Sequence, residues 1–151
     1  MLENILIVCI GNICRSPMGA ALLQARLADI IPHVSVSSAG LDAMINWPAD
    51  PFAQELMQEK GLTIANHRAR QITNDLVTSA ELILTMTNKQ QKELGKTFPN
   101  ACGKVYRLGM WGEYDVIDPY KRSRNVFEHA LALIERGLDD WCKKIWNIPK
   151  D

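Results

Sequence analysis

VCIGNICRSP, residues 8–17, carries the strongest structural signal in this chain of 151 residues. The apolar run just before it, residues 5–8, is too short for a helix and rich in β-branched side chains, so it predicts a buried strand that ends at Cys9. Ser16 followed by Pro17 is typical of a helix start, with the Ser16 hydroxyl as N-cap and Pro17 at the first helical position. The intervening residues are therefore expected to form a tight loop between the end of a strand and the N-terminus of a helix.

The expected loop has the properties of an anion site. Several backbone N–H groups would point at one spot, where the positive end of the helix dipole adds to their charge. Gly11 allows close approach of the backbone, Asn12 tolerates a positive φ, and the planar Arg15 guanidinium suits two phosphate oxygens at once. The same dipoles and Arg15 would hold the sulfur of Cys9 as a thiolate. Because a thiolate beneath a bound phosphate is a nucleophile directed at phosphorus, the loop predicts phosphoryl-transfer chemistry.

Residues 8–17 resemble the phosphate-binding loop of the low-molecular-weight protein tyrosine phosphatases. Further motifs of that family follow in order along nearly the whole chain: Ser38 with Ala39 and Gly40, the connector around His67, and the triplet Asp118-Pro119-Tyr120. The single tyrosine of the triplet and the short segment after the last expected helix resemble the bacterial type. The resemblance implies hydrolysis of protein phosphotyrosine through a cysteinyl-phosphate intermediate.

Cleavage of an aryl phosphate ester also needs a proton donor for the leaving oxygen and then a base for the attacking water. One carboxyl group can serve as both. The residues alone leave four candidates open, which are Asp42, Asp50, Asp115 and Asp118. The resemblance of the triplet 118–120 to the family's general-acid loop selects Asp118 as the acid and base.

The resemblance implies a role for each remaining site residue. Cys9, Arg15 and Asp118 would be catalytic, and the phosphate would be bound by the loop residues Ile10, Gly11, Asn12, Ile13, Cys14, Arg15 and Ser16. Four residues would keep the loop in shape through hydrogen bonds: Asn12, Ser16, Ser38 and His67. Trp47 and Tyr120 are candidate walls of a substrate cleft deep enough to favour phosphotyrosine over phosphoserine. Cys14 is expected to form a reversible disulfide with Cys9, which would protect the nucleophile from irreversible oxidation.

Strands and helices alternate along the rest of the chain. The first helix has an apolar stripe made of Met18, Ala21, Leu22, Ala25 and Ala28. Further strands are expected at residues 34–38, 81–86 and 104–108, and further helices from 51 to a stop at Gly61, at 73–80, from 87 to near 95, and at 123–147. This order predicts the α/β class, as a single-domain four-stranded parallel sheet with helices on both faces that spans residues 1–151. Ligands of such sheets bind at the carboxyl ends of the strands, where Cys9 is expected.

Composition argues against several function classes. The chain has 17 basic and 17 acidic residues, too balanced for the broad basic face that nucleic acid requires. No segment resembles a signal peptide or could span a bilayer, so we expect a cytoplasmic protein without membrane insertion. The cysteines lack paired CxxC spacing, the nucleotide fingerprints GxxxxGK(S/T) and GxGxxG are absent, and we expect neither a metal nor a cofactor.

Two other functions stay open at this point. An arsenate reductase of the same fold needs further cysteines to relay electrons, and residues 81–95, where the relay is expected, contain none. A non-catalytic phosphotyrosine-binding module would keep Arg15 and the amides but would need neither the thiolate of Cys9 nor the carboxyl group of Asp118. Because both are present, we favour the phosphatase. Its expected partner is a phosphotyrosine protein, for example an autophosphorylating bacterial tyrosine kinase in polysaccharide export, and the enzyme is expected to be a monomer.

Overall fold

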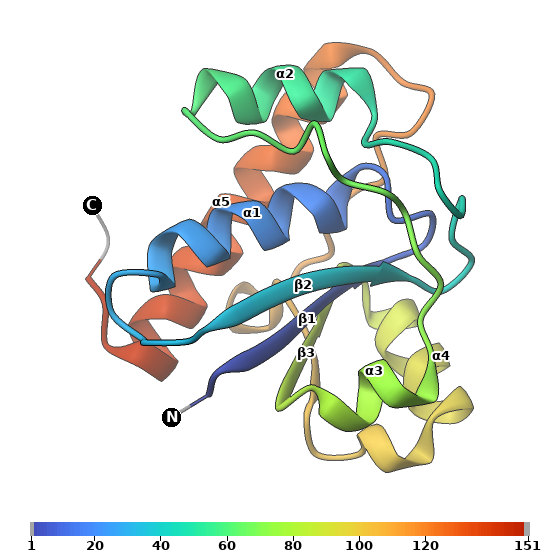
Figure 1. The fold of residues 1–151 in the computed structure, drawn as a ribbon, viewed down its shortest axis with the longest axis vertical. Coiled ribbons are helices and arrows are strands. Elements are labelled where there is room, and N and C mark those ends of the chain that lie inside the picture. Colours follow the sequence, from blue (N-terminus) through green and yellow to red (C-terminus); the bar gives the residue numbers. More distant parts are fainter. Residues whose placement is uncertain (1, 150–151) are drawn as a thin grey trace.

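The computed structural model describes residues 2–149. The strands β1 (Asn4–Cys9), β2 (Ser35–Gly40), β3 (Leu82–Thr85) and β4 (Val105–Arg107) form one parallel sheet in the order β2-β1-β3-β4 (Figure 1). The α-helices are α1 (Arg15–Leu27), α2 (Pro51–Glu59), α3 (Asn74–Ser79), α4 (Asn88–Thr97) and α5 (Arg124–Trp146). Short 3-10 helices, η1 (Pro99–Ala101) and η2 (Met110–Gly112), follow α4 and β4. The expected α/β class with a four-stranded parallel sheet is confirmed.

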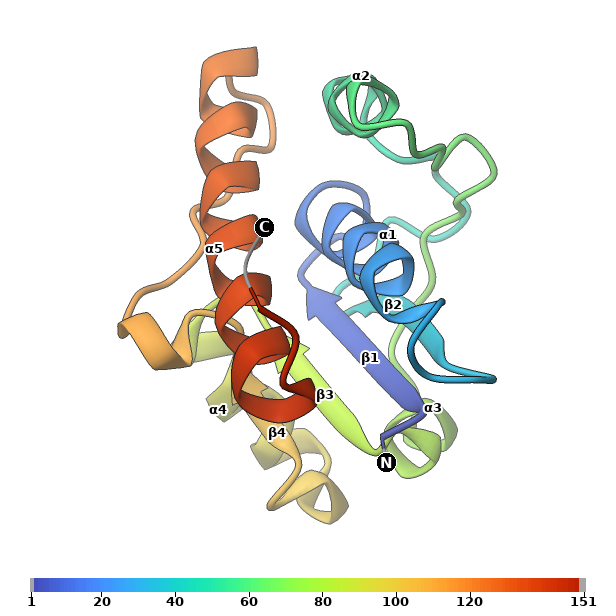
Figure 2. The same cartoon turned by 90° about the vertical axis from the view of Figure 1, so that its left-hand side faces the viewer.

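Helices cover both faces of the sheet (Figure 2). Ile5 and Ile7 of β1 pack on the side of α1 and α5, whereas Leu6 and Val8 pack on the side of α3 and α4. Because both faces are buried, β1 is a continuous apolar run rather than an alternation of apolar and polar residues. Helix α2 lies beyond α1 and contacts both α1 and α5 (Figure 2).

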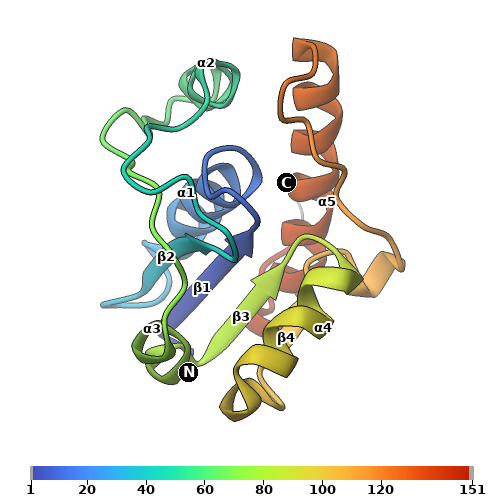
Figure 3. The same cartoon turned by 90° about the vertical axis from the view of Figure 1, so that its right-hand side faces the viewer.

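Strand β1 lies inside the sheet, between β2 and β3, and Figure 3 shows β1 and β3 ending at the same edge. The connection after β1 leads to α1 on one face, whereas the connection after β3 leads to α4 on the other. The two connections diverge from that edge, which is the position where open α/β sheets bind their ligands. Cys9 is the last residue of β1 and lies at this point.

The sequence prediction of Ser16 as the N-cap of the first helix is wrong. Helix α1 begins at Arg15 after Cys14, whose side chain makes no capping hydrogen bond. The buried Ser16 hydroxyl instead contacts the sulfur of Cys9 and the side-chain amide of Asn12. A serine hydroxyl enclosed by a thiol and an amide has better partners there than the backbone of its own helix.

The apolar stripe proposed for this helix is also wrong in part. Ala25 and Ala28 are exposed, whereas Leu23 and Leu27 are fully buried. Leu22, Leu23 and Leu27 make up most of the buried face of α1, because their side chains fill more of the space between α1 and the sheet than alanine side chains would. In the last helix, α5, the apolar residues at helical spacing are buried except Ile145, which is exposed near the helix end; the buried ones are Phe127, Ala130, Leu131, Ile134, Leu138 and Trp141.

Side-chain caps mark the starts of α2, α3 and α4. The Asp50 carboxylate accepts a hydrogen bond from Phe52 N, and the Thr73 and Thr87 hydroxyls accept hydrogen bonds from Leu76 N and Gln90 N. The side chain of Gln90 does not complete a capping box with Thr87, because it accepts a hydrogen bond from Met86 N at 2.9 Å. It thereby ties the start of α4 to the end of β3.

Candidate active site

In the loop after β1, the backbone carbonyl oxygens of residues 10–13 point away from the loop itself and toward neighbouring segments. Four consecutive carbonyls accept hydrogen bonds from outside the loop: Ile10 O from Asp42 N at 3.0 Å, Gly11 O from Met44 N at 3.0 Å, Asn12 O from His67 Nε2 at 2.7 Å, and Ile13 O from Asp50 N at 2.8 Å. Within the part of the chain that the structure describes, the backbone amides of residues 11–14 donate to no protein group. Free amides that converge before a helix N-terminus form a cradle for an anion.

Asn12 fixes the shape of the loop through its backbone and its side chain. Its φ is 61°, in the left-handed region, and it is fully buried. The side-chain Nδ2 donates to Ser16 Oγ at 2.7 Å and to Ser38 Oγ at 2.9 Å, and Oδ1 accepts from Arg70 N at 2.9 Å. The residues expected to support the loop are therefore brought together, and the Arg70 backbone is a further partner that no sequence pattern predicts.

Cys9 lies at the base of the cradle and is only 3% exposed. Its sulfur is 2.9 Å from Ser16 Oγ. Because Asn12 already donates to that oxygen, the hydroxyl hydrogen of Ser16 is free to donate to the sulfur. This hydrogen bond would stabilise negative charge on the sulfur, both as a nucleophile and as a leaving group.

Arg15 and Asp118 meet at the same pocket. Arg15 is buried, and its Nη1 donates to the carbonyl of Val116 at 3.0 Å. Its Nη2 lies 3.7 Å from Asp118 Oδ2, and the Asp118 side chain is 56% exposed. The Tyr120 amide donates to Asp118 Oδ1 at 3.1 Å, so the carboxyl group is oriented from two sides.

The pocket above Cys9 has a volume of about 140 Å³ and is narrow. Its walls are the loop residues Cys9 to Arg15 together with Asp42, Met44, Asp118 and Tyr120. Of the four carboxylates left open by the sequence, Asp50 caps α2 and Asp115 pairs with Arg107, whereas Asp42 and Asp118 line the pocket. Only Asp118 of these four forms an ion pair with Arg15.

The apolar wall differs from the one expected. Tyr120 lines the pocket, but Trp47 lies outside its lining and is 54% exposed. Met44, three residues earlier on the same loop, takes the wall position, because its backbone is bonded to Gly11 of the cradle. A methionine in a loop without periodicity carries no sequence signal for such a role, so the sequence did not predict Met44, whereas Asp42, one of the four candidate acids, does line the pocket.

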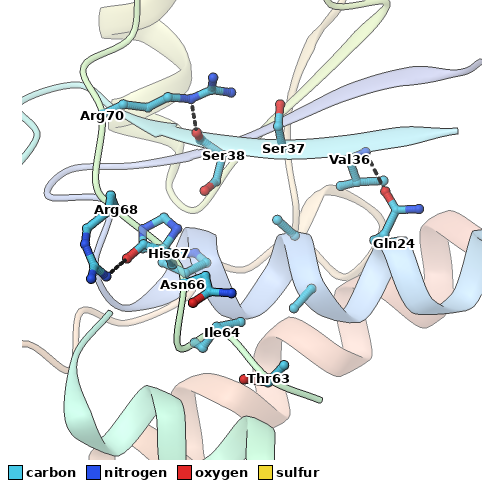
Figure 4. A pocket seen from close by; sticks show the side chains of 13 residues that line it. Gln24, Val36, Ser37, Ser38, Thr63, Ile64, Asn66, His67, Arg68 and Arg70 are labelled. Carbon is cyan, nitrogen blue, oxygen red and sulfur yellow. Dashed lines mark hydrogen bonds between the residues drawn. The ribbon is translucent and has the colours of Figure 1, made fainter. Parts of the chain in front are cut away.

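A second layer of polar contacts supports the cradle, and Figure 4 shows two of its side chains, His67 and Arg70, beside Ser38. Burial lowers the pKa of His67, so at neutral pH its ring is uncharged and Nε2–H donates to the Asn12 carbonyl. Arg70 Nε donates to the carbonyl of Ser38 at 2.9 Å. These residues also line a broader hollow of about 480 Å³ between α1, β2 and residues 63–70, which does not include Cys9.

Cysteines are free thiols throughout the described residues. Burial, helped by the nearby Asp50, Cys9 and Asp118, raises the pKa of Cys14 strongly, so it is a neutral thiol inside the loop. Cys102 is exposed, and Cys142 is buried in α5. Neither lines the pocket of Cys9.

Residues 2–149 have neither a cluster of metal-ligating side chains nor a helix able to cross a membrane. They contain no group of three or more His, Cys, Asp or Glu side chains placed to hold a metal ion. No helix among them combines the length and the apolar character needed to cross a membrane.

Comparisons with known proteins agree along nearly the whole length of the chain. The family model described as "Low molecular weight phosphotyrosine protein phosphatase" matches residues 4–148. A probable low molecular weight protein-tyrosine-phosphatase, EpsP of Ralstonia solanacearum, is 48% identical over 145 residues, which cover 96% of this chain and 97% of that protein.

Solved structures show the same fold. Wzb of Vibrio vulnificus in complex with benzylphosphonate superposes with a TM-score of 0.89 at 38% identity, covering 96% of this chain and all of that one. The YwlE arginine phosphatase from Geobacillus stearothermophilus superposes with a TM-score of 0.86 at 33% identity, covering 95% of this chain and 92% of that one. The neighbours thus share one fold but are named for two kinds of phosphoryl substrate.

Proposed function

The chain belongs to the low molecular weight phosphotyrosine protein phosphatase family, and we propose that its pocket hydrolyses protein phosphotyrosine in two steps through a cysteinyl-phosphate on Cys9. The protein is accordingly a hydrolase, a protein-tyrosine-phosphatase. One observation carries the mechanism: the sulfur of Cys9 lies beneath the free amides of residues 11–14, in a pocket that Arg15 and Asp118 share.

In the first step the Cys9 thiolate attacks phosphorus. A sulfur–phosphorus bond forms while the bond from phosphorus to the tyrosine oxygen breaks, and the Asp118 carboxyl group gives its proton to that oxygen. Arg15 and the loop amides stabilise the charge that develops on the other three phosphate oxygens. These donors are held in place beforehand by the outward hydrogen bonds of the loop carbonyls, so little reorganisation is needed during the reaction.

In the second step a water molecule attacks the phosphorus of the phospho-enzyme. The Asp118 carboxylate takes a proton from the water, a phosphorus–oxygen bond forms, and the sulfur–phosphorus bond breaks. The Ser16 hydroxyl, 2.9 Å from the sulfur, stabilises the departing thiolate. Free phosphate leaves, and Cys9 and Asp118 return to their starting states.

Selection for phosphotyrosine would follow from the burial of Cys9, which lines the pocket but is only 3% exposed. Phosphorus lies farther from the backbone in phosphotyrosine than in phosphoserine, so only the former reaches Cys9 at the base. Met44 and Tyr120 are the walls that would contact the aromatic ring. Trp47 is exposed on the same loop as Met44, and we assign it contacts with the substrate protein outside the pocket.

The physiological substrate that we propose is an autophosphorylating bacterial tyrosine kinase of polysaccharide export. The enzyme would act on it in the cytoplasm as a monomer, with residues 1–151 as one domain and without a metal or cofactor. Support comes from the resemblance to the bacterial type and from the bacterial relatives of nearly equal length.

The test compares three peptides of one sequence that carry phosphotyrosine, phosphoserine or phosphoarginine. We expect metal-independent phosphate release from phosphotyrosine alone. Cys9→Ser should abolish it, and Asp118→Ala should slow it by roughly 10²–10³, most strongly for substrates with poor leaving groups. Phosphate release is followed under reducing conditions with a chelator present.

Three results would contradict the proposal. Preferred turnover of phosphoarginine would place the enzyme with the arginine phosphatase rather than with the tyrosine phosphatases. Tight phosphopeptide binding without phosphate release would indicate a binding module. Thioredoxin-linked arsenate reduction that disappears in Cys102→Ser would revive the reductase, although Cys102 is exposed and does not line the pocket.

A further inference from the structure

Three consecutive residues attach the segment that carries Asp118 to three different parts of the fold. This segment, residues 108–123, connects β4 to α5. Tyr114 contacts α5, Asp115 contacts β4 and α4, and Val116 contacts the end of β3 and Arg15. Ile117 and Asp118, which follow directly, are exposed, and Asp118 lines the pocket.

Asp115 makes the polar attachment of this segment. Its Oδ1 accepts a hydrogen bond from Asn88 N, at the positive end of α4, and one from Arg107 Nη1, both at 3.0 Å. Charge-assisted hydrogen bonds of this kind are stronger than neutral ones and fix a direction as well as a distance. Asp115 therefore cannot shift along the surface without losing the helix N-terminus or the Arg107 guanidinium.

Val116 connects Asp115 to the pocket through two hydrogen bonds of its backbone. Its amide donates to Met86 O at 2.9 Å, and its carbonyl accepts from Arg15 Nη1 at 3.0 Å. The same guanidinium lies 3.7 Å from Asp118. A movement of residues 115 and 116 would displace the Asp118 carboxyl group relative to the bound ester.

We propose that Arg107 is a positioning residue for proton transfer: through Asp115 it holds Asp118 at the distance from the leaving oxygen that protonation requires. The proposal rests on the function proposed above for Asp118. Neither Arg107 nor Asp115 lines the pocket, so the pair acts only through the segment between them and Asp118. Proton transfer depends steeply on placement, whereas binding of the phosphate by the loop does not involve this pair.

The test removes the guanidinium with Arg107→Gln and measures kcat/KM, which reports transfer of phosphate to Cys9. For phenyl phosphate, whose leaving group needs the proton, we expect a loss of about tenfold. For 4-nitrophenyl phosphate, which leaves readily without it, we expect a loss of less than about twofold. Arg107→Lys keeps the positive charge and should recover most of the activity. Inhibition by inorganic phosphate should be unchanged, because the cradle is intact.

The matched control is Lys60→Gln. Lys60 forms an ion pair with Glu135 at 3.0 Å that is exposed to a similar degree and joins α2 to α5 away from the pocket. Both variants should melt close to the parent, because exposed ion pairs contribute little to stability. Lys60→Gln should leave the ratio of the two substrates unchanged.

The variant Asp118→Ala, alone and combined with Arg107→Gln, distinguishes a failure of this proposal from a failure of the function that it rests on. If Asp118→Ala shows no dependence on the leaving group, the assigned acid is wrong and the proposed function fails first. If Asp118→Ala shows it but Arg107→Gln slows both substrates equally, the positioning role is overturned. Adding Arg107→Gln to Asp118→Ala should cause no further loss on phenyl phosphate, and a further loss of about tenfold would also overturn it.

Discussion

Asn12 joins three parts of the site that are separated in the chain. It contacts Ser16 on the adjoining helix, Ser38 on β2, and the backbone of Arg70 and the ring of His67 on the connector. Its left-handed backbone turns the loop, and its amide uses both donors and an acceptor inside the protein. A buried amide satisfied in this way specifies one loop shape, because any other shape would leave polar atoms without partners.

Cys14 is predicted to protect the enzyme from irreversible oxidation. Peroxide is expected to convert Cys9 to a sulfenic acid, which then condenses with the Cys14 thiol to form a disulfide and release water. We predict that dithiothreitol restores most of the activity of the parent but less of that of Cys14→Ser, where the sulfenic acid can oxidise further. The raised pKa of Cys14 keeps it a thiol and should make the condensation slow.

The measurement is activity after timed exposure to peroxide, with and without reductant. Cys142→Ser is the matched control, since Cys142 is also a buried thiol with a pKa raised by burial but lies in α5. It should recover like the parent. Equal recovery of Cys14→Ser and the parent would show that Cys14 has no protective role.

The end of β2 is shaped to accept the phosphate-binding loop. Gly40 is the last residue of β2, and its amide and carbonyl are bonded to Arg70 and Ile72 of the connector. A Cβ atom there would overlap the carbonyl oxygen of Ile10 and lie 3.1 Å from the Cβ of Asn12. Only glycine lets the strand and the loop approach this closely.

Gly40→Ala is therefore expected to destabilise the protein by about 1–3 kcal/mol and to reduce activity sharply, because the backbone of Ile10 must move. Gly95→Ala is the matched control. Gly95 lies inside α4, and a Cβ there meets nothing within 4 Å. Gly95→Ala should stabilise the protein by about 0.5–1 kcal/mol without changing its activity. Urea denaturation and turnover measure both effects, and a Gly40→Ala protein as stable and active as the parent would refute the packing argument.

Binding of an anion in the cradle is expected to stabilise the native state of the whole molecule. The cradle, Arg15 and the segment with Asp118 come from the start and the end of the chain, and they meet where β1 and β3 end (Figure 3). An anion in the cradle would hold these segments together in the native state alone. Binding of this kind adds stability in proportion to the logarithm of the ligand concentration.

We therefore predict that inorganic phosphate raises the melting temperature. At roughly 100 times its dissociation constant, phosphate should add about 2.7 kcal/mol to the free energy of unfolding, which corresponds to several degrees. Arg15→Met should lose most of this rise, whereas Arg26→Met, at a surface ion pair of α1, should keep it. Differential scanning fluorimetry at matched ionic strength checks this. An equal rise with sodium chloride would mean that the effect is not site-specific.

Short-range patterns predicted much of this protein. The apolar run of β1, the helix starts expected near residues 51, 73 and 87, and the alternation of strands and helices predicted the fold class and the position of Cys9 at the end of a strand. These signals work because they depend on the backbone and on neighbours within one helical turn. The grouping of Asn12, Ser38 and His67 came from the family resemblance rather than from such physics, since each alone is an ordinary polar loop residue.

Contacts between distant segments decided what these patterns could not. Ser16 has the signature of an N-cap, but the sulfur of Cys9 and the amide of Asn12 enclose its hydroxyl. Met44 rather than Trp47 lines the pocket, and Arg107 pairs with Asp115, only because packing of the sheet and its connections brings them there. Local preferences are worth a fraction of a kcal/mol per residue, whereas a buried polar group left unsatisfied costs about 1–3 kcal/mol, so tertiary contacts prevail wherever the two conflict.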